Sequence, residues 1–304
     1  KIYVIASDGD LQEGVASEAC SLAGHLGLNN LIVVYDDNHI SIDGPTELSF
    51  TEDRAQRYEA YGWYVQEVDG DGNDMEAFER ALINAKSEVQ RPCMIKLRTH
   101  IAYGSPNLQD TATAHGAPLG EDEIKLMKKK FGCDPEKTFH VPEDVSNHMR
   151  QALERGREAE DEWNKAFKAY AKKYPDLAKE FTVASEGNLP VDLDLVLPKF
   201  EAGQSIATRK ASGKVLDALM PHLPLVLGGS ADLTPSNNTR FADAADFQKD
   251  VPDGRYIRFG VREHAMGAIL NGISLSGLLR AYGGTFLVFS DYMRGAVRVA
   301  ALSK

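Results

Sequence analysis

Two short apolar segments, residues 2–6 and 31–35, limit the fold of this chain more than any other feature. Between them lies an apolar stripe with α-helical spacing, formed by Val15, Ala19, Leu22, Ala23 and Leu26. Gly27 follows, in a position that suits the C-terminal cap of that helix. A strand, a helix and a strand of this size predict a parallel pair joined by a right-handed crossover. We expect both strands to be buried in an α/β fold.

Polar residues follow both predicted strands. Asp8 and Gly9 come after the first strand, and Asn38 follows the second. The carboxyl ends of neighbouring parallel strands line the ligand crevice of an α/β sheet, so we expect Asp8 and Asn38 to converge. Their oxygens suit Mg²⁺ or Ca²⁺. Gly9 lets a phosphate approach the backbone, and a helix beginning near Gln12 offers free N–H groups. An Asp-Gly turn without a ligand is the alternative, but the two strand ends together favour a metal and phosphate site.

The rest of the chain continues the α/β pattern. We predict a helix at residues 76–86 and a strand at residues 94–97. Residues 143–180 are charged and helical, with an aromatic stripe formed by Trp163, Phe167 and Tyr170. After an irregular stretch at 189–198, a second α/β pattern begins near Ala207. Its predicted helix covers residues 264–275, and its predicted strands cover residues 225–229, 256–259 and 285–289.

Composition excludes several classes of protein. The net charge of -11 and the pI near 5.3 leave no basic face for nucleic acid. No apolar stretch reaches the roughly 18 residues of a membrane span. Cys20, Cys93 and Cys133 match no zinc or disulfide pattern, which favours the reducing cytoplasm. The acidic run that begins at Asp69 does not fit a calcium-binding loop, because Asp74 stands where such a loop requires Gly and Arg80 where it requires Glu.

Motifs scattered over nearly the whole chain resemble those of the transketolase family of thiamine-diphosphate enzymes. The family's Gly-Asp-Gly motif, which ends in Asn about thirty residues later, is present here with Ser7 in place of the first Gly. The other matching segments occur in the family's order, at residues 11–14, 21–26, 58–63, 115–119, 207–210, 229–237 and 262–267.

The resemblance implies a fold and a cofactor site. It implies two thiamine-diphosphate-binding type α/β domains with parallel sheets flanked by helices. Residues 1–190 would be the C-terminal part of a diphosphate and metal domain plus a helical linker, and residues 191–304 the N-terminal part of a pyrimidine domain. The metal ligands would be the side chains of Asp8 and Asn38 and the carbonyl of Ile40. Ser7, Gly9, Glu13, His115 and Asp232 would also lie at the cofactor.

An acid is needed beside the aminopyrimidine ring of thiamine, and the resemblance implies Glu263. Burial in apolar surroundings favours a carboxyl that can hold a proton. The alternative for Glu263 is an acidic residue favoured by the helix dipole. Phe286, Phe289 and Tyr292 would form the aromatic pocket for the ring, although such spacing is also typical of core packing. In this family the cofactor lies between the two subunits of a homodimer, where Glu13 would meet the Glu263 of a second copy.

Sugar-phosphate substrates need cationic and hydroxyl donors. By resemblance these are Arg209 and Ser236, and His115 would touch the reacting oxygens or the diphosphate. The implied reaction transfers a two-carbon ketol unit from a ketose phosphate to an aldose phosphate through a thiamine-diphosphate adduct. Two alternatives stay open: a dihydroxyacetone synthase-like transfer to formaldehyde, and a truncated chain that dimerises or binds cofactor without turnover. We expect the isolated 304-residue fragment to be inactive.

Overall fold

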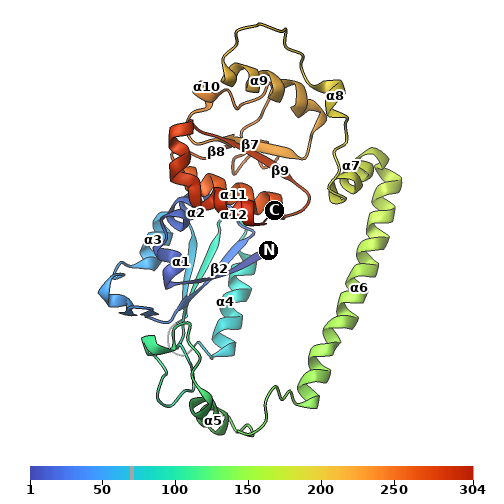
Figure 1. Cartoon of the computed structure of the whole chain (residues 1–304). Coiled ribbons are helices and arrows are strands. Elements are labelled where there is room, and N and C mark those ends of the chain that lie inside the picture. Colours follow the sequence, from blue (N-terminus) through green and yellow to red (C-terminus); the bar gives the residue numbers. More distant parts are fainter. Residues whose placement is uncertain (69–71, 304) are drawn as a thin grey trace.

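The computed structural model describes residues 1–68 and 72–303. Figure 1 shows two α/β units, one in blue and cyan and one in orange and red, with the long helix α6 running along one side of the molecule. Part of the acidic run at 69–74 therefore lies outside the described residues. Within those residues, no helix is both long enough and apolar enough to cross a membrane.

The sheet of the first unit has four parallel strands in the order β1-β2-β6-β5. They are β1 (Ile2–Ser7), β2 (Leu31–Asp37), β6 (Cys93–Arg98) and β5 (Tyr64–Val68). The predicted parallel pair of β1 and β2 is confirmed, with Ser7 opposite Asp36. This register brings the residues that follow the two strands to the same edge of the sheet.

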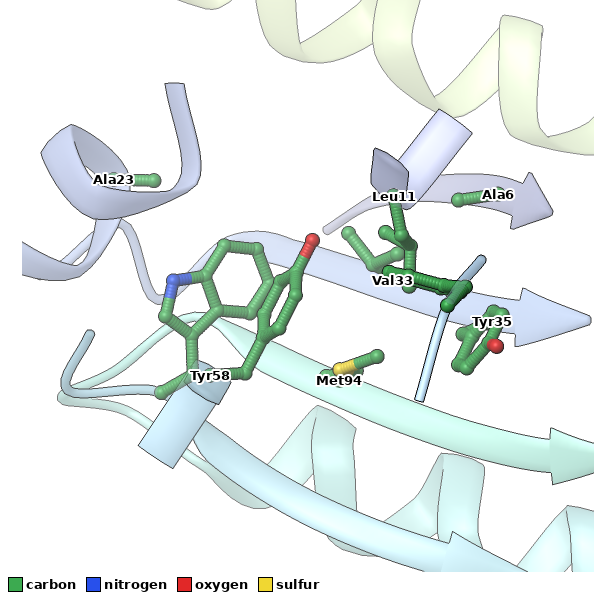
Figure 2. Packing of buried hydrophobic residues seen from close by; sticks show 9 residues of the cluster. Ala6, Leu11, Ala23, Val33, Tyr35, Tyr58 and Met94 are labelled. Carbon is green, nitrogen blue, oxygen red and sulfur yellow. The ribbon is translucent and has the colours of Figure 1, made fainter. Parts of the chain in front are cut away.

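Alternation along β2 divides the first unit into two cores. Val33 and Tyr35 face a core covered by α1 (Asp8–Gln12), α2 (Gly14–His25) and α3 (Arg54–Ala60) (Figure 2). Ile32 faces the opposite core, against α4 (Met75–Ser87). Successive side chains of a strand point to opposite faces, so a run of apolar residues is expected in a strand that is covered on both sides.

The prediction that the first strand is buried is wrong for most of its length. Ile2, Tyr3, Val4 and Ile5 are between 40% and 81% exposed, and only Ala6 is buried. Among the described strands, β1 is at the edge of the sheet and pairs with β2 alone. Its apolar sequence suits a covered strand, but neither face of its first four residues is covered here.

The first helix begins earlier than the sequence indicates. Helix α1 starts at Asp8, and α2 starts at Gly14 after a break at Glu13. Both the backbone N–H and the hydroxyl of Ser7 donate to Asp10 Oδ2, at 2.8 and 2.9 Å. The serine that replaces the family's glycine therefore anchors the start of α1, in the manner of a helix cap.

A mostly irregular segment and the long helix connect the two units. The short strands β3 (Ile40–Ser41) and β4 (Gly44–Pro45) pair with each other just beyond β2, and a 3₁₀ turn, η1, follows at Thr46–Leu48. The connection after β6 contains the turn η2 (Ala112–Ala114), α5 (Glu121–Lys130), α6 (Glu143–Lys173), α7 (Pro175–Ser185) and α8 (Leu193–Val196). The stretch at 189–198, predicted to be irregular, thus includes one helical turn. On α6, the predicted aromatic stripe packs against Phe181 of α7.

The sheet of the second unit has three parallel strands in the order β8-β7-β9. They are β8 (Tyr256–Arg258), β7 (Val226–Ser230) and β9 (Arg280–Gly284), and the short turn η3 (Met220–His222) precedes β7. The surrounding helices are α9 (Thr208–Leu219), α10 (Thr234–Asn237), α11 (Glu263–Leu275) and α12 (Arg294–Ser303).

The strand predicted at residues 285–289 is wrong, because β9 ends at Gly284 and the 3₁₀ segment η4 (Leu287–Met293) follows. The apolar and aromatic residues there have high strand propensity, but β7 ends at Ser230, opposite Gly284, and offers no further partner. Without a ladder to join, the backbone turns, and Phe289 N–H donates to Phe286 O at 2.9 Å.

Helix α2 joins the two units. Its Leu22 and Leu26 pack into a cluster with Ile257, Phe259 and Met266 of the second unit, while Ala23 faces the first sheet. The single apolar stripe predicted from the sequence therefore serves two cores. In Figure 1, α11 and α2 lie at the junction of the units.

Candidate functional site

Asp8 is a buried carboxylate at the carboxyl end of the first sheet. The residue begins α1 and is 2% exposed. Its Oδ1 accepts a hydrogen bond from the Tyr35 hydroxyl. Its other oxygen, Oδ2, is buried and has no hydrogen-bond partner among the residues that the structure describes. An unpartnered buried carboxylate oxygen is unfavourable unless something else satisfies it.

Asp37 lies on the same face of β2 as Tyr35, two residues further along. Its Oδ1 lies 2.9 Å from the Tyr35 hydroxyl, and Arg54 Nη2 of α3 pairs with the same oxygen at 3.2 Å. His39 Nε2 is 3.3 Å from Oδ1, and Lys96 Nζ is 3.8 Å from Oδ2. Asp37 is therefore a buried carboxylate surrounded by basic groups.

The electrostatics of Asp8 follow from this setting. Burial raises the pKa of the Asp8 carboxyl, and the neighbouring Asp37 raises it further. The Tyr35 hydrogen bond and the positive charge of Arg54 act in the opposite direction. Burial also raises the pKa of the Tyr35 hydroxyl, which therefore remains a hydrogen-bond donor at neutral pH.

Asn38 and Ile40 lie beside Asp8 at the same edge. Because Ser7 is opposite Asp36, Asp8 and Asn38 follow neighbouring strand ends. His39 has a positive φ of 63°, which turns the chain between β2 and β3. Asn38 Oδ1 accepts from the N–H of Ile40 at 2.9 Å, so the amide is held by the same segment that carries the predicted carbonyl ligand. Asn38 also lines a cavity of about 770 Å³.

These residues fit a hard divalent cation. Within residues 1–68 and 72–303, no group of three or more His, Cys, Asp or Glu could hold a metal. The predicted set is of another kind, with one carboxylate, one amide and one backbone carbonyl, and Mg²⁺ bound in that way takes further oxygens from water and phosphate. The unpartnered Oδ2 of Asp8 is the observation on which this fit depends.

Ser7, Gly9 and Glu13 surround this edge. The Ser7 hydroxyl is engaged by Asp10, which differs from the diphosphate contact that the resemblance implies for it. Gly9 is exposed, and a Cβ there would meet no atom closer than 4.0 Å. Glu13 is exposed at the N-cap of α2.

Glu263 begins α11, next to the junction with α2. It is 8% exposed. The adjacent residues attach the start of α11 to α2: Ala265 N–H donates to Glu18 Oε2 at 2.9 Å, and Arg262 Nη2 donates to Ser21 Oγ at 3.2 Å. These contacts of Glu18, Ser21 and Arg262 were not predicted from the sequence. The helical pattern could have indicated only that Glu18 and Ser21 belong to one helix, α2.

The three predicted pocket aromatics form a ladder on the surface. Phe286 and Phe289 stack with ring centroids 5.9 Å apart, and Tyr292 is 6.2 Å from Phe289. Phe286 is 39% exposed and Tyr292 69% exposed. The core-packing alternative therefore does not hold for these two residues, and they offer aromatic faces to a ligand or a partner surface.

The structure brings Arg209 and Ser236 together from separate helices. Arg209 Nη1 on α9 is 3.4 Å from the carbonyl oxygen of Ser236 on α10. The Arg209 side chain is exposed, so most of its donors are available to an anion. Asp232 lies between β7 and α10 and has a positive φ of 57°. It lines a small cavity of about 160 Å³ together with Arg258.

His115 is exposed in the loop after η2. The described contacts of the chain join the predicted residues into local groups, namely Asp8 with its neighbours, Asn38 with Ile40, and Arg209 with Ser236. Among those contacts, none joins His115, Glu263 or the Arg209 pair to Asp8.

The network of Tyr35, Asp37 and Arg54 was missed from the sequence. Strand alternation places Tyr35 and Asp37 on one face and could have revealed that part of it.

Comparisons with known proteins agree along the whole chain. Residues 1–190 match the family model described as "Transketolase, thiamine diphosphate binding domain", and residues 204–304 match "Transketolase, pyrimidine binding domain". The curated transketolase of Mycobacterium tuberculosis is 52% identical over 311 residues, covering 99% of this chain and 44% of the relative. That of Geobacillus stearothermophilus is 49% identical over 301 residues, covering 99% and 45%.

Solved structures give the same result. A Pichia stipitis transketolase in complex with sedoheptulose 7-phosphate superposes with a TM-score of 0.95 at 47% identity, over 99% of this chain and 45% of that chain. A Campylobacter jejuni transketolase superposes with a TM-score of 0.90 at 40% identity. The chain thus spans less than half the length of the relatives it matches.

Proposed function

This chain belongs to the transketolase family, and from that premise we propose that the protein transfers a two-carbon ketol unit from a ketose phosphate to an aldose phosphate. The proposal includes thiamine diphosphate and Mg²⁺ or Ca²⁺ as cofactors. The observation that carries it is the buried Asp8, whose Oδ2 lacks a partner at a sheet edge shared with Asn38. Bound thiamine diphosphate would supply the nucleophilic carbon that carries the two-carbon unit.

The metal and diphosphate end of the site is the first part of the proposal. Asp8, Asn38 and the carbonyl of Ile40 would hold the cation, and its positive charge would offset the negative charge of the diphosphate. Gly9 leaves room for the phosphate to approach the backbone. Ser7 anchors the start of α1, because the N–H and hydroxyl that the resemblance implies at the diphosphate both donate to Asp10.

Glu263 and the aromatic ladder form the pyrimidine end. Glu263 would hold a proton at the aminopyrimidine ring, and its low exposure favours that role because little water competes there. Phe286, Phe289 and Tyr292 would stack against the ring. His115 would act at the reacting oxygens or the diphosphate, and Asp232 would border the cofactor.

Substrate selection is assigned to Arg209 and Ser236. The contact between them, and the free donors of the exposed Arg209, support a phosphate-binding pair. The Pichia stipitis relative is described as a complex with sedoheptulose 7-phosphate, a phosphorylated sugar. We therefore favour a phosphorylated acceptor over formaldehyde. Comparing ribose 5-phosphate with formaldehyde as acceptor distinguishes ketol transfer of the transketolase type from that of dihydroxyacetone synthase.

The organisation of the protein follows from the same proposal. Residues 1–190 would be the diphosphate and metal domain with a helical linker, and residues 191–304 the pyrimidine domain. The two separate sheets support this division. A complete site would need the diphosphate edge of one subunit and the Glu263 of a second copy. Glu13, exposed at the start of α2, would then meet the Glu263 of that copy. The three free cysteines support the cytoplasm as the compartment.

Cofactor titration tests the metal site. Thiamine diphosphate is titrated into the complete protein with Mg²⁺ and again with excess chelator, and binding is followed by calorimetry. We expect binding to require the metal, and Asp8→Asn to abolish it. Asp36→Asn is the matched control, since Asp36 lies near the carboxyl end of the neighbouring strand β2, opposite Ser7, but its carboxylate accepts a hydrogen bond from Thr99. Equal affinity with and without chelator would remove the metal from the proposal.

Mixing two inactive variants tests the shared site. If the site is built from two subunits, a heterodimer of Asp8→Asn and Glu263→Gln contains one site with both defects and one site with neither. Activity should therefore reappear on mixing and subunit exchange. If both ends of the site came from one chain, every site in the heterodimer would carry one defect, and the mixture would remain inactive.

The second candidate is that the 304-residue chain alone binds cofactor or dimerises without turnover. The exposed apolar residues of β1 favour it, because the strand that leads to Asp8 is uncovered over its first four residues. Small displacements of catalytic groups are costly to rate. Transfer from xylulose 5-phosphate to ribose 5-phosphate is measured with the purified chain, cofactor and Mg²⁺. We expect little or none, and robust turnover would refute this candidate.

A further inference from the structure

The Tyr35 hydroxyl is a fixed point between two buried carboxylates. Tyr35 is fully buried in the first core, packed with Val33, Leu11 and Met94 (Figure 2). Its hydroxyl is hydrogen-bonded to Asp8 Oδ1 and lies 2.9 Å from Asp37 Oδ1. A phenol on a packed aromatic ring has little freedom to move, so whatever it bonds to is held at a defined place.

Asp37 is itself held by two basic side chains. Arg54 Nη2 lies 3.2 Å from Asp37 Oδ1, and the Arg54 side chain is only 12% exposed. Lys96 Nζ approaches the other oxygen at 3.8 Å. These cations balance the negative charge that Asp37 places beside Asp8, and they fix the carboxylate that in turn faces the Tyr35 hydroxyl.

The consequence at Asp8 is a carboxylate with two unequal oxygens. Oδ1 is occupied by Tyr35, whereas Oδ2 is buried and has no partner in residues 1–68 and 72–303. We propose that Tyr35, supported by Asp37 and Arg54, is a positioning residue that fixes the Asp8 carboxylate so that Oδ2 is presented to the divalent cation. This inference rests on the proposed function, because it assigns Asp8 as a metal ligand.

Removing the Tyr35 hydroxyl tests the inference. Hydrogen-bonding partners of metal ligands typically contribute about 10–100-fold to metal affinity. In the complete protein, Tyr35→Phe should therefore raise the Mg²⁺ concentration that gives half-maximal thiamine-diphosphate binding by about 10-fold or more. At saturating Mg²⁺, turnover should return to within about twofold of the parent, since only binding of the ion is weakened.

Tyr58→Phe is the matched control. Tyr58 is 1% exposed in the same core, and its hydroxyl contacts Cys20 Sγ at 3.4 Å rather than Asp8. Both variants lose one buried hydroxyl from the same core. Only Tyr35→Phe should change the Mg²⁺ requirement. The same half-saturating Mg²⁺ in both variants and the parent would overturn the inference.

Arg54→Gln gives a second test, in which the loss of positional support and the simple loss of charge predict opposite changes in Mg²⁺ affinity. This test stands even if Tyr35→Phe does not fold. Loss of a positive charge near the site would by itself attract the cation more strongly. Loss of the support for Asp37 should instead weaken binding, so we expect a several-fold rise in half-saturating Mg²⁺. A fall would overturn the inference. If the parent protein binds cofactor without metal, the proposed metal site has failed as well, which distinguishes the two results.

Discussion

Gly24 on α2 gives the sharpest prediction of the structure, because backbone from another element lies where its side chain would be. A Cβ at this position would be 1.8 Å from the carbonyl oxygen of Tyr61 and 3.3 Å from the ring of Trp63. Ordinary van der Waals contacts begin at 3.4 Å, so Gly24→Ala requires the Tyr61 carbonyl to retreat by about 1.6 Å.

That retreat would disturb a hydrogen bond as well as the packing. Trp63, two residues beyond Tyr61, donates from its indole nitrogen to the carbonyl of Cys20 on α2 at 2.9 Å. Overpacking typically costs about 1–3 kcal/mol, and a lost buried hydrogen bond adds about 1 kcal/mol. Since the obstacle is backbone, we expect a loss of about 3 kcal/mol. For a chain of 304 residues the unfolding entropy is roughly 0.6 kcal/mol/K, so Tm should fall by about 5 °C.

Thermal unfolding followed by circular dichroism measures this effect, with Gly14→Ala as the matched control. Gly14 is the first residue of the same helix, and a Cβ there would meet no atom within 4 Å. Alanine is the better helix former by up to about 1 kcal/mol, so the control should melt at the parent temperature or slightly above it. If Gly24→Ala melts within about 1 °C of the parent, the close approach of α2 to the Tyr61–Trp63 turn is not as described.

Three further outcomes are expected. Glu263→Gln should fold and bind cofactor but lose most turnover, because an amide cannot hold and return a proton; parental proton exchange at the thiazolium carbon of the variant would remove Glu263 from that role. Arg209→Gln should raise the KM for phosphorylated sugars by about 10–100-fold with a smaller effect on kcat, and an equal effect on unphosphorylated sugars would contradict the assignment. Glu123 accepts hydrogen bonds from Ser105 and Asn107, which hold its pKa below the usual 4.5. Because the native pKa is lowered, the ionised Glu123 carboxylate stabilises the folded loop above pH 4.5. That stabilisation is lost as the pH falls through the native pKa. Glu123→Gln should therefore speed amide exchange of Asn107 at pH 7, and the difference from the parent in loop stability should shrink below pH 4.5.

The strand pair and its polar ends could be predicted from the sequence because they depend on local order. Two short apolar segments with a helical pattern between them located β1 and β2. Parallel pairing then required Asp8 and Asn38 to share an edge of the sheet. The network behind Asp8 could not be found in that way, since Arg54 comes from α3, and only the packing of that helix on β2 brings it to Asp37.

The errors have a common physical cause. The apolar residues of β1 and of residues 285–289 have the propensity of buried strands, but propensity does not say whether a neighbour is available. Burial of β1 needs a cover that the described residues do not supply, and the strand at 285–289 needs a partner beyond the end of β7. The start of α1 was missed because the hydrogen bonds from Ser7 to Asp10 act over three residues and outweigh the turn preference of Asp-Gly.

The long helix α6 has a consequence for how this protein can change over evolutionary time. None of its 31 residues is buried, and its packing is concentrated where Trp163 and Phe167 stack 5.1 Å apart and Phe167 meets Phe181. Selection acts strongly on residues whose replacement destabilises a core and weakly on solvated ones. Descendants of this sequence should therefore keep aromatic residues at these three positions while the exposed turns from Glu143 to Arg155 drift. The same turns are the place to attach a fluorescent label without disturbing either sheet.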